Sequence, residues 1–371
     1  MKNRKVFEAE NGNWVRIPSV VADPEGRVYA FANRRVGTHS DHADETEVVL
    51  RVRERDGEWG REMRFFRPGW SYMIGSAVCD ENTGKVFCHF MKIAVTEPEF
   101  QKILPPGERD RLAREKELRD GEKEGCYVIE GSGECFSVRP VTITPNPEAK
   151  GHFFAAGTGF SHGSGAGITI KRGQYAGRLV VPARFNLHDT VRWEDLKTGS
   201  TNTVIWSDDH GESWHTGGTV EPGTGEGTLS ELSDGSIYLN SRAYFGDGFR
   251  RDAVSRDGGA TFTEQRRCSD LIEPCCNAAV VRAEWKGKEI LFFSNPHSTS
   301  ERVDMTVHYS TDGGKSWQYG LRVDNRKASY SSLAYDRERE ELILLYECGT
   351  ETCIDEVDEA ILPVGEVAAE A

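Results

Sequence analysis

The stretch Ser310-Thr311-Asp312-Gly313-Gly314-Lys315-Ser316-Trp317 decides the fold, because its pattern, Ser-x-Asp-x-Gly-x-x-Trp/Phe, occurs three times. The other copies are 207–214 (SDDHGESW) and 255–262 (SRDGGATF). In such a stretch the Asp can accept hydrogen bonds from backbone N–H groups of its own turn, the glycines can take a positive φ, and the closing aromatic ring can pack beneath the turn. Each copy follows an apolar or β-branched run, so each is predicted to be a hairpin turn.

The spacing of the copies is typical of a β-propeller. They begin at residues 207, 255 and 310, so 48 and then 55 residues separate them. A period of this size holds the four short strands of one propeller blade. A fourth, eroded copy is predicted at 53–59, where the Ser is missing and the pattern is one residue short. We therefore predict an all-β chain, a single domain over 1–371 built as a six-bladed β-propeller. The turns mark a fold and carry no activity of their own.

One segment departs from the all-β pattern. Between about 98 and 123 the composition shifts to Glu, Lys, Arg and Leu, most densely at 109–118. This predicts a short, solvated helical insertion in an early blade, expected to be the second, and we assign it no chemistry.

The composition excludes several classes of partner. Hydrophobic residues make up 37% of the chain, there are 39 glycines, and the mean hydropathy is −0.56. These values suit an all-β protein rich in turns, and no apolar run approaches the ~20 residues of a membrane helix. The net charge of −14 argues against nucleic acids and anionic membrane surfaces as partners, since both are polyanions. A small anionic substrate fits if arginines are concentrated locally.

The nine cysteines form no C-x-x-C ladder and their number is odd. The Lys-rich start at 1–5 is followed by no apolar segment of the kind that a signal peptide carries. Free thiols and a cytoplasmic location are therefore expected, with a secreted or periplasmic location as the alternative if a signal peptide has been removed. For Cys275-Cys276 a redox role is the alternative to two small core or strand-end residues, and we favour the latter.

Charged side chains recur at the ends of predicted strands. Arg16 lies inside the apolar run 14–21, where Pro18 favours a strand end or edge, and a charge there needs a partner or a polar cavity. The stretch 225–242 predicts a hairpin around Asp234-Gly235. Antiparallel pairing then brings Glu226, at the start of one strand, to the same end as Arg242.

The loop at 36–45 contains His39, Asp41, His42 and Asp44, all of which could bind a metal. Their spacing matches no helical pair, EF-hand loop or cysteine-backed site, so a metal is not expected. A carboxylic acid beside Arg34 and Arg35 suits acid–base chemistry on an anionic substrate better.

Taken in order around the repeated turns, these residues resemble the exo-α-sialidases. The motifs that carry the resemblance are Arg16-Ile17-Pro18, the strand end 31–35, Gly225-Glu226 with Asn240-Ser241-Arg242, Arg302, and Ser329-Tyr330-Ser331. The likeness runs from about 14 to 348. The repeated turns look like the Asp boxes of the family and are weak evidence alone, whereas the ordered Arg, Glu and Tyr residues between them are more specific.

The resemblance implies roles for individual residues. Arg16, Arg242 and Arg302 would be the arginine triad that grips the substrate carboxylate, and Arg35 would be the additional arginine near the glycosidic centre. Tyr330 would be the nucleophile and Glu226 the carboxylate paired with it. Asp41 would be the acid/base, with Asp44 as the rival because the length of this loop varies in the family. No metal or cofactor is implied, and the expected partner is a sialylated glycan or a related acidic sugar.

The chemistry of the substrate explains these residue types. A sialic acid carries a carboxylate on its anomeric carbon, so an anionic Asp or Glu nucleophile would meet like charge. A neutral tyrosine avoids this repulsion, and sialidases are the known tyrosine exception among glycosidases. Tyrosine has a pKa of about 10, so a base must accept its proton. Arginines fix the carboxylate by charge-assisted hydrogen bonds.

The chain also departs from the family. Asn33 stands where an acidic residue is common, Ile74-Gly75 replaces an Asn-Pro pair, and Ser332 replaces an aspartate. The region at 74–75 lines the acyl side of the pocket in relatives, so the preferred sugar is left open. The alternatives are a glycosidase of the same mechanism acting on Kdn or Kdo, and a catalytically silent sugar-binding propeller.

Overall fold

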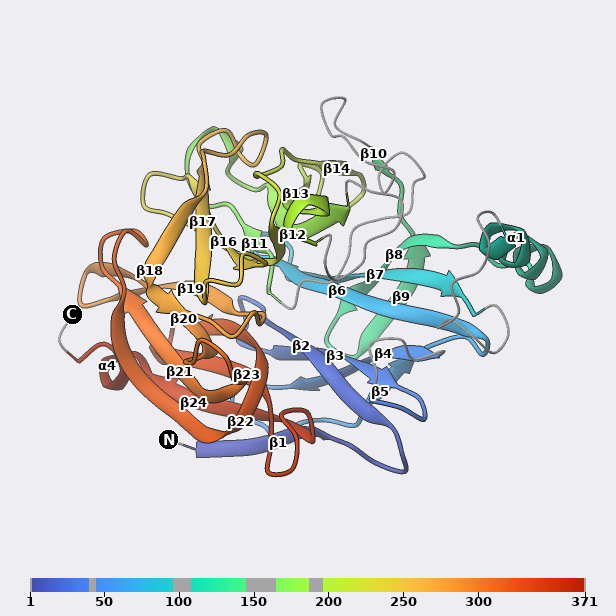
Figure 1. The fold of residues 1–371 in the computed structure, drawn as a ribbon, viewed down its shortest axis with the longest axis horizontal. Helices are drawn as coiled ribbons and strands as arrows, with labels where there is room; N and C mark the ends of the chain where they lie inside the picture. Colours follow the sequence, from blue (N-terminus) through green and yellow to red (C-terminus); the bar gives the residue numbers. More distant parts are fainter. Residues whose placement is uncertain (1, 40–44, 96–107, 145–164, 187–195, 370–371) are drawn as a thin grey trace.

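The computed structural model describes residues 2–39, 45–95, 108–144, 165–186 and 196–369, and strands dominate these ranges (Figure 1). Their arrangement is that of a β-propeller, with twisted sheets set around a common centre. The all-β prediction is confirmed.

Four of the five sheets in the described part of the chain have four or five strands, the size of a single blade. The first contains β2 (Trp14–Ala22), β3 (Val28–Arg35), β4 (Thr46–Arg53) and β5 (Met63–Phe65). The second contains β6 (Trp70–Asp80), β7 (Lys85–Ala94), β8 (Gly125–Ser132) and β9 (Cys135–Pro140). The third contains β10 (Ile143–Thr144), β11 (Ile168–Thr169), β12 (Leu179–Asn186), β13 (Ser200–Ser207) and β14 (Trp214–Thr216). The fourth contains β15 (Thr224–Glu231), β16 (Ile237–Ala243), β17 (Phe249–Ser255) and β18 (Arg266–Ile272).

The fifth sheet has seven strands and corrects our prediction of six separate blades. It contains β19 (Ala279–Trp285), β20 (Lys288–Pro296), β21 (Val303–Ser310), β22 (Gln318–Asp336), β23 (Glu341–Gly349), β24 (Glu356–Pro363) and β1 (Lys2–Glu8). The strand β22 pairs with β21 along its first half and with β23 along its second. Because no turn interrupts β22, the hydrogen-bonded sheet continues from β21 through β22 to β23, where a break between two blades was expected. Four separate blades and one larger sheet result.

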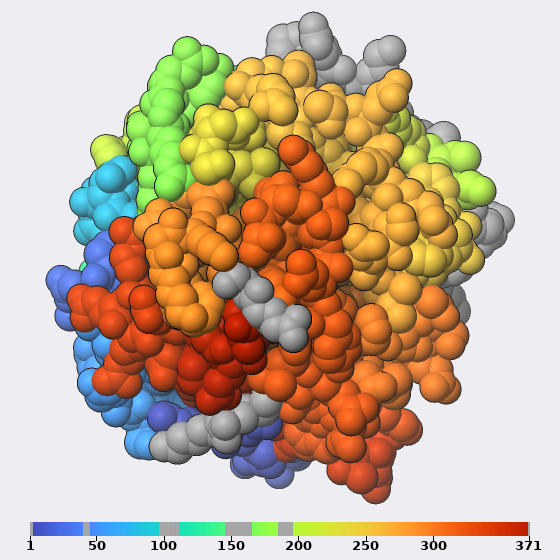
Figure 2. All heavy atoms as spheres, turned by 90° about the vertical axis from the view of Figure 1, so that its left-hand side faces the viewer, coloured from blue at the N-terminus to red at the C-terminus, as the bar shows by residue number. Residues whose placement is uncertain are grey.

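The innermost strands form a ring. The strands β2, β6, β12, β15, β19 and β22 each contact the next in chain order, and β22 contacts β2. The two ends of the chain meet in the same sheet, because β1 pairs antiparallel with β24. Figure 2 shows the N-terminal residues in blue beside the orange and red C-terminal part. Strands distant in sequence are thereby brought around one centre.

The three repeated turns form as predicted, between β13 and β14, between β17 and β18, and between β21 and β22. In the last copy Ser310 Oγ donates to Asp312 over 2.8 Å and accepts from the N–H of Gly314 over 2.9 Å, while Asp312 accepts from the N–H of Ser316 over 3.0 Å. The other two copies repeat these hydrogen bonds. The eroded copy occupies the matching link between β4 and β5, where Asp56 pairs instead with Arg339.

The predicted insertion contains the helix α1 (Glu108–Asp120) between β7 and β8, at the edge of the second sheet (Figure 1). It is anchored there by Asp120, which accepts a hydrogen bond from the Trp70 indole at 3.1 Å, and Lys116 of the same helix donates to this carboxylate over 2.7 Å. The remaining helical segments described are η1 (Gly173–Tyr175), α3 (Leu196–Gly199) and α4 (Val364–Val367). None of the described helices combines the length and apolarity that crossing a membrane requires.

Candidate functional site

Tyr330 is the centre of the candidate site. It lies on β22, and the residue is 7% exposed. Its hydroxyl donates a hydrogen bond to the carboxylate of Glu226 and accepts one from Arg242 Nη1 over 2.9 Å. The phenol oxygen is therefore held between a carboxylate and a guanidinium.

Glu226 and Arg242 come from the hairpin formed by β15 and β16. Its register places Thr224 opposite Ala243 and Gly227 opposite Ser241, so both side chains lie at the end of the hairpin away from its turn. Arg242 Nη1 donates to Glu226 Oε2 over 2.7 Å, and both side chains are buried. The expected position of this pair at one end of the hairpin is confirmed.

Arg16 reaches the site from β2. Its guanidinium carbon lies 5.3 Å from the centre of the Tyr330 ring. Both its Nε and its Nη2 donate to the carboxylate of Glu347, over 3.1 and 3.2 Å. Glu347 is fully buried on β23, and it also accepts the backbone N–H groups of Ile17 and Tyr330, over 2.8 and 3.2 Å. One carboxylate thus connects Arg16 to the backbone of Tyr330.

Arg302 approaches from the connection between β20 and β21. Its guanidinium carbon lies 5.6 Å from the centre of the Tyr330 ring. Its Nη1 donates to Ser329 Oγ over 3.1 Å, and its Nη2 donates to the carbonyl of Cys275 over 3.4 Å. Arg16, Arg242 and Arg302 therefore surround one tyrosine, although they are spread over most of the chain.

Neighbouring charged groups and burial set the protonation states of Glu226 and Tyr330 at the centre of the site. Burial alone would raise the pKa of Glu226, but Arg242 and Arg184 outweigh burial and lower this pKa to about 2. Burial and the adjacent Glu226 carboxylate raise the pKa of Tyr330 well above its ordinary value. In the free site Glu226 is therefore ionised and Tyr330 carries its proton.

Irregular strand pairing orients the side chains of Arg16, Glu226 and Tyr330. The register shifts between Arg16 and Ser19 in β2, between Thr224 and Gly227 in β15, and between Ala328 and Ser331 in β22. A bulge of this kind bends a strand and redirects the side chains in it. Arg16, Glu226 and Tyr330 each stand at such a shift, on innermost strands that face the centre of the ring.

Arg35 lies at the end of β3 and is buried. It stands opposite Trp14, two residues before Arg16 along β2, and its Nη1 donates to the carbonyl of His39 over 2.9 Å. Asp41 and its rival Asp44 lie outside the described residues, so their placement relative to Tyr330 stays a prediction.

Sequence reasoning missed Glu347, Arg184 and Cys275. A signal existed for Glu347, because a carboxylate ends the otherwise apolar strand 342–346 and a charge in such a strand needs a partner. Arg184 follows the apolar run 179–183 in the same way. The position of Cys275 beside Arg242 had no signal, since it depends on how two sheets meet.

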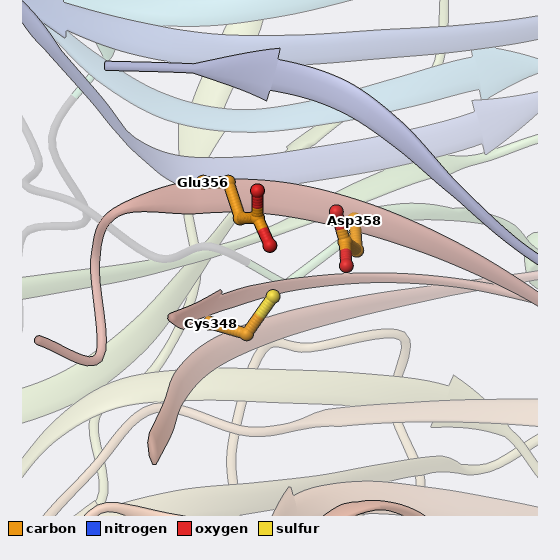
Figure 3. Close-up of side chains that lie close together, drawn as sticks. All are labelled: Cys348, Glu356 and Asp358. Atoms are coloured by element: carbon orange, nitrogen blue, oxygen red, sulfur yellow. The ribbon is translucent and has the colours of Figure 1, made fainter. Parts of the chain in front are cut away.

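One cluster outside this site carries groups that could bind a metal. Cys348, Glu356 and Asp358 point toward one another (Figure 3), and their ligand atoms lie within 4.8 Å. The guanidinium of Arg326 reaches all three, with 2.8 Å to Glu356, 2.9 Å to Asp358 and 3.3 Å to the Cys348 sulfur. A cationic side chain therefore already occupies the position that a metal ion would take.

In sequence and fold, the chain is similar to one group of known proteins. Residues 162–341 match the family described as the BNR repeat-like domain. A sialidase from Micromonospora viridifaciens is 34% identical over 339 residues, which cover 86% of this chain and 47% of that protein. The chain thus spans about half the length of this relative. Sialidase-3 of Mus musculus is 24% identical, and the match covers 95% of this chain and 91% of that protein.

Two solved structures share the fold. The intramolecular trans-sialidase from Ruminococcus gnavus, solved with oseltamivir carboxylate, superimposes with a TM-score of 0.74 at 17% identity, covering 100% of this chain and 99% of that one. A Hadza microbial sialidase gives a TM-score of 0.74 at 21% identity, covering 96% and 66%. At these identities the likeness concerns the fold.

Proposed function

Because the chain belongs to the sialidase family with BNR repeats, we propose that it is a retaining exo-α-sialidase that releases terminal sialic acids from glycoconjugates. One observation carries the proposal. The Tyr330 hydroxyl contacts both Glu226 and Arg242, and the guanidinium groups of Arg16 and Arg302 lie beside its ring.

The three arginines are suited to a substrate carboxylate. They concentrate positive charge on a chain whose net charge is −14, and guanidinium groups bind carboxylates through paired, charge-assisted hydrogen bonds. Arg16 is held by Glu347, which limits its rotation before substrate arrives. The site is therefore already organised to receive an acidic sugar.

Tyr330 is proposed as the nucleophile. Its oxygen would attack the anomeric carbon while the glycosidic C–O bond breaks and the aglycone leaves, which forms a tyrosyl-enzyme intermediate with inversion. Water would then displace the tyrosine oxygen with a second inversion, so the configuration is retained overall. A neutral phenol can approach a carbon that bears a carboxylate without like-charge repulsion.

The proton of Tyr330 goes to Glu226, and the bound substrate makes this transfer easier. In the free site Arg242 helps to keep the pKa of Glu226 at about 2, which makes Glu226 a weak base. A substrate carboxylate bound at Arg242 adds a negative charge nearby, and a like charge raises the pKa of a carboxyl group. Substrate binding thereby makes Glu226 a stronger base, while Arg242 remains beside the developing phenolate.

The acid/base role is proposed for Asp41, with Asp44 as the rival. The residue in this role protonates the leaving oxygen, so its loss harms poor leaving groups most. We expect Asp41→Ala to reduce turnover of sialyllactose far more than turnover of an activated aryl sialoside. If Asp44→Ala has this selectivity and Asp41→Ala does not, the assignment passes to Asp44.

We also propose that the seven-stranded sheet counts as two blades joined through β22, which makes six blades in all. The ring of contacts β2–β6–β12–β15–β19–β22 supports this count, since each blade contributes one innermost strand. On this reading, blade five ends and blade six begins within β22.

The proposed function is tested by an activity screen of the intact chain. Release of 4-methylumbelliferone from the α-glycoside of Neu5Ac is measured beside the Kdn and Kdo glycosides, and sialyllactose serves as the natural-type substrate. We expect the Neu5Ac glycoside to be hydrolysed fastest. Faster release from the Kdn or Kdo glycoside would reassign the substrate, and binding of a sialic acid without any turnover would indicate a silent sugar-binding propeller.

A further inference from the structure

A short turn between β18 and β19 joins two arginines of the candidate site through one residue, Cys275. Arg242 Nε donates a hydrogen bond to the Cys275 sulfur over 3.4 Å. Arg302 Nη2 donates to the backbone carbonyl of Cys275, also over 3.4 Å. The side chain of this residue therefore contacts one guanidinium and its main chain contacts the other.

A buried ion pair between Glu273 and Arg250 holds this turn in place. Glu273 accepts the N–H of Ala243, the residue that follows Arg242, over 2.7 Å, and it also accepts Arg250 Nη1 over 2.8 Å. The same Nη1 atom donates to the carbonyl of Cys276 over 2.6 Å. Glu273 and Arg250 are both almost completely inaccessible to solvent. The turn is thus attached to the strand that carries Arg242.

The backbone of Cys275 is in an unusual conformation. Its φ is +50°, in the left-handed region that residues other than glycine seldom adopt. Such a conformation persists where the surrounding structure imposes it, and it is common at functional sites. Here it lets the carbonyl reach Arg302 while the sulfur reaches Arg242. Cys276, whose own thiol is buried beside Ser329, does not share this position.

We propose that Cys275 is a positioning residue, which sets the orientation of Arg242 through its thiol and of Arg302 through its carbonyl. The two guanidinium groups then meet the substrate carboxylate at a defined separation. This inference rests on the proposed function and deepens it, because it names the residue that orients two of the three arginines toward the acidic group of the sugar.

The kinetic test compares Cys275→Ala, Cys275→Ser and the control Cys135→Ala, which removes an exposed free thiol on β9, the end strand of the second sheet. With an aryl sialoside we expect Cys275→Ala to raise KM about fivefold, the effect of losing one modest hydrogen bond, with a change in kcat below about twofold. Cys275→Ser should recover part of the loss because a hydroxyl also accepts a hydrogen bond. The melting temperature of each variant is measured alongside.

Two kinetic outcomes would overturn the proposal. One is an unchanged KM in Cys275→Ala. The other is a KM that rises equally in Cys275→Ala and Cys275→Ser together with a fall in melting temperature, since that pattern indicates loss of structure alone.

A second experiment uses the unmodified protein and needs no variant. The chain is treated with N-ethylmaleimide, with and without an unsaturated sialic acid analogue, and modification of each cysteine is followed by mass spectrometry. We expect the analogue to slow modification of the partly exposed Cys275 and to leave the rate at Cys135 unchanged. Equal rates at Cys275 with and without saturating analogue would overturn the proposal.

The two experiments separate this inference from the proposed function. If the wild-type chain neither turns over a sialoside nor binds the analogue, the proposed function fails. If the wild-type chain does both and Cys275 is either not protected or not required, only the positioning role fails.

Discussion

At the scale of single residues, the site is organised by charge around one phenol. Tyr330 shares its oxygen between Glu226 and Arg242, and these two residues also pair directly over 2.7 Å. Each of the three groups therefore influences the protonation of the others. Removing one member should change chemistry or pH dependence more than it changes the fold.

We expect Tyr330→Phe to lower kcat at least about a thousandfold, because the ring remains and only the nucleophilic oxygen is lost. Binding of an unsaturated sialic acid analogue should remain measurable by calorimetry, since the arginines are retained. The control is Tyr346→Phe, which removes another buried phenol that hydrogen-bonds a carboxylate, that of Asp324. Full activity in Tyr330→Phe would exclude this residue from the mechanism.

Glu226 should make the free energy of unfolding depend on pH in a defined direction. Its pKa of about 2 in the folded protein lies below the ordinary 4.5, so the ionised group stabilises the fold above about pH 4.5 and this contribution is lost as the pH falls toward 2. We therefore expect Glu226→Gln to flatten the decline of unfolding free energy over this window, measured by urea unfolding.

The control for this measurement is Glu231→Gln on the same strand. Burial raises the pKa of the Glu231 carboxyl, so its contribution has the opposite sign. Its replacement should leave the acid decline as steep or steeper. If both variants flatten the decline equally, the low pKa of Glu226 is not its cause.

At the scale of elements, two devices build the site. The repeated Ser-x-Asp turns tie outer strands together with hydrogen bonds inside one turn, as Asp312 shows with the N–H of Ser316. Register shifts in the inner strands interrupt regular hydrogen bonding between strands. They thereby redirect the side chains of Arg16, Glu226 and Tyr330. The turns therefore stabilise the sheets, and the bulges orient the side chains of the candidate site.

We expect Asp312→Ala to reduce the unfolding free energy by about 1–3 kcal/mol, because several donors of the turn lose their acceptor at once. The KM for an aryl sialoside should stay unchanged. Asp56→Ala in the eroded turn is the matched control, since Asp56 is exposed and pairs with Arg339 across the surface. An equal loss of stability in both variants would show that the intact turn pattern has no special role.

At the scale of the whole molecule, closure of the ring holds the site together. The strand β1 completes the sheet that contains β22 and β23, although its residues precede them by more than three hundred positions. Phe7 on β1 is buried in a cluster with Val15 of β2 and Leu345 of β23. The start of the chain therefore packs against the strands that carry Arg16 and Glu347.

We expect Phe7→Ala to lower the unfolding free energy by about 3–5 kcal/mol, the usual cost of removing a buried aromatic side chain. Activity should be lost at a lower temperature than in the wild-type chain. Phe66→Ala is the control, because Phe66 is 49% exposed and its removal leaves no comparable cavity. Similar melting temperatures for Phe7→Ala and the wild-type chain would contradict a role for β1 in closure.

The features that the sequence by itself determined are local ones. The three repeated turns, the hairpin that pairs Glu226 with Arg242, and the helix near 108–120 depend on residues close together in the chain, whose hydrogen bonds and periodicity are visible in the sequence. The turns also indicated a propeller, because their spacing repeats. The roles of Arg35 and of Asp41 against Asp44 stay predictions.

Only the tertiary structure decided the features that depend on distant segments. The continuity of β22 replaced six separate blades with four and a larger sheet, and strand bulges chose which side chains face the centre. Glu347 meets Arg16 across 331 residues of sequence, and Cys275 meets both Arg242 and Arg302 from a turn between other strands. No local pattern encodes such contacts, because they exist only once the ring of strands has closed and packing has selected one register for every sheet.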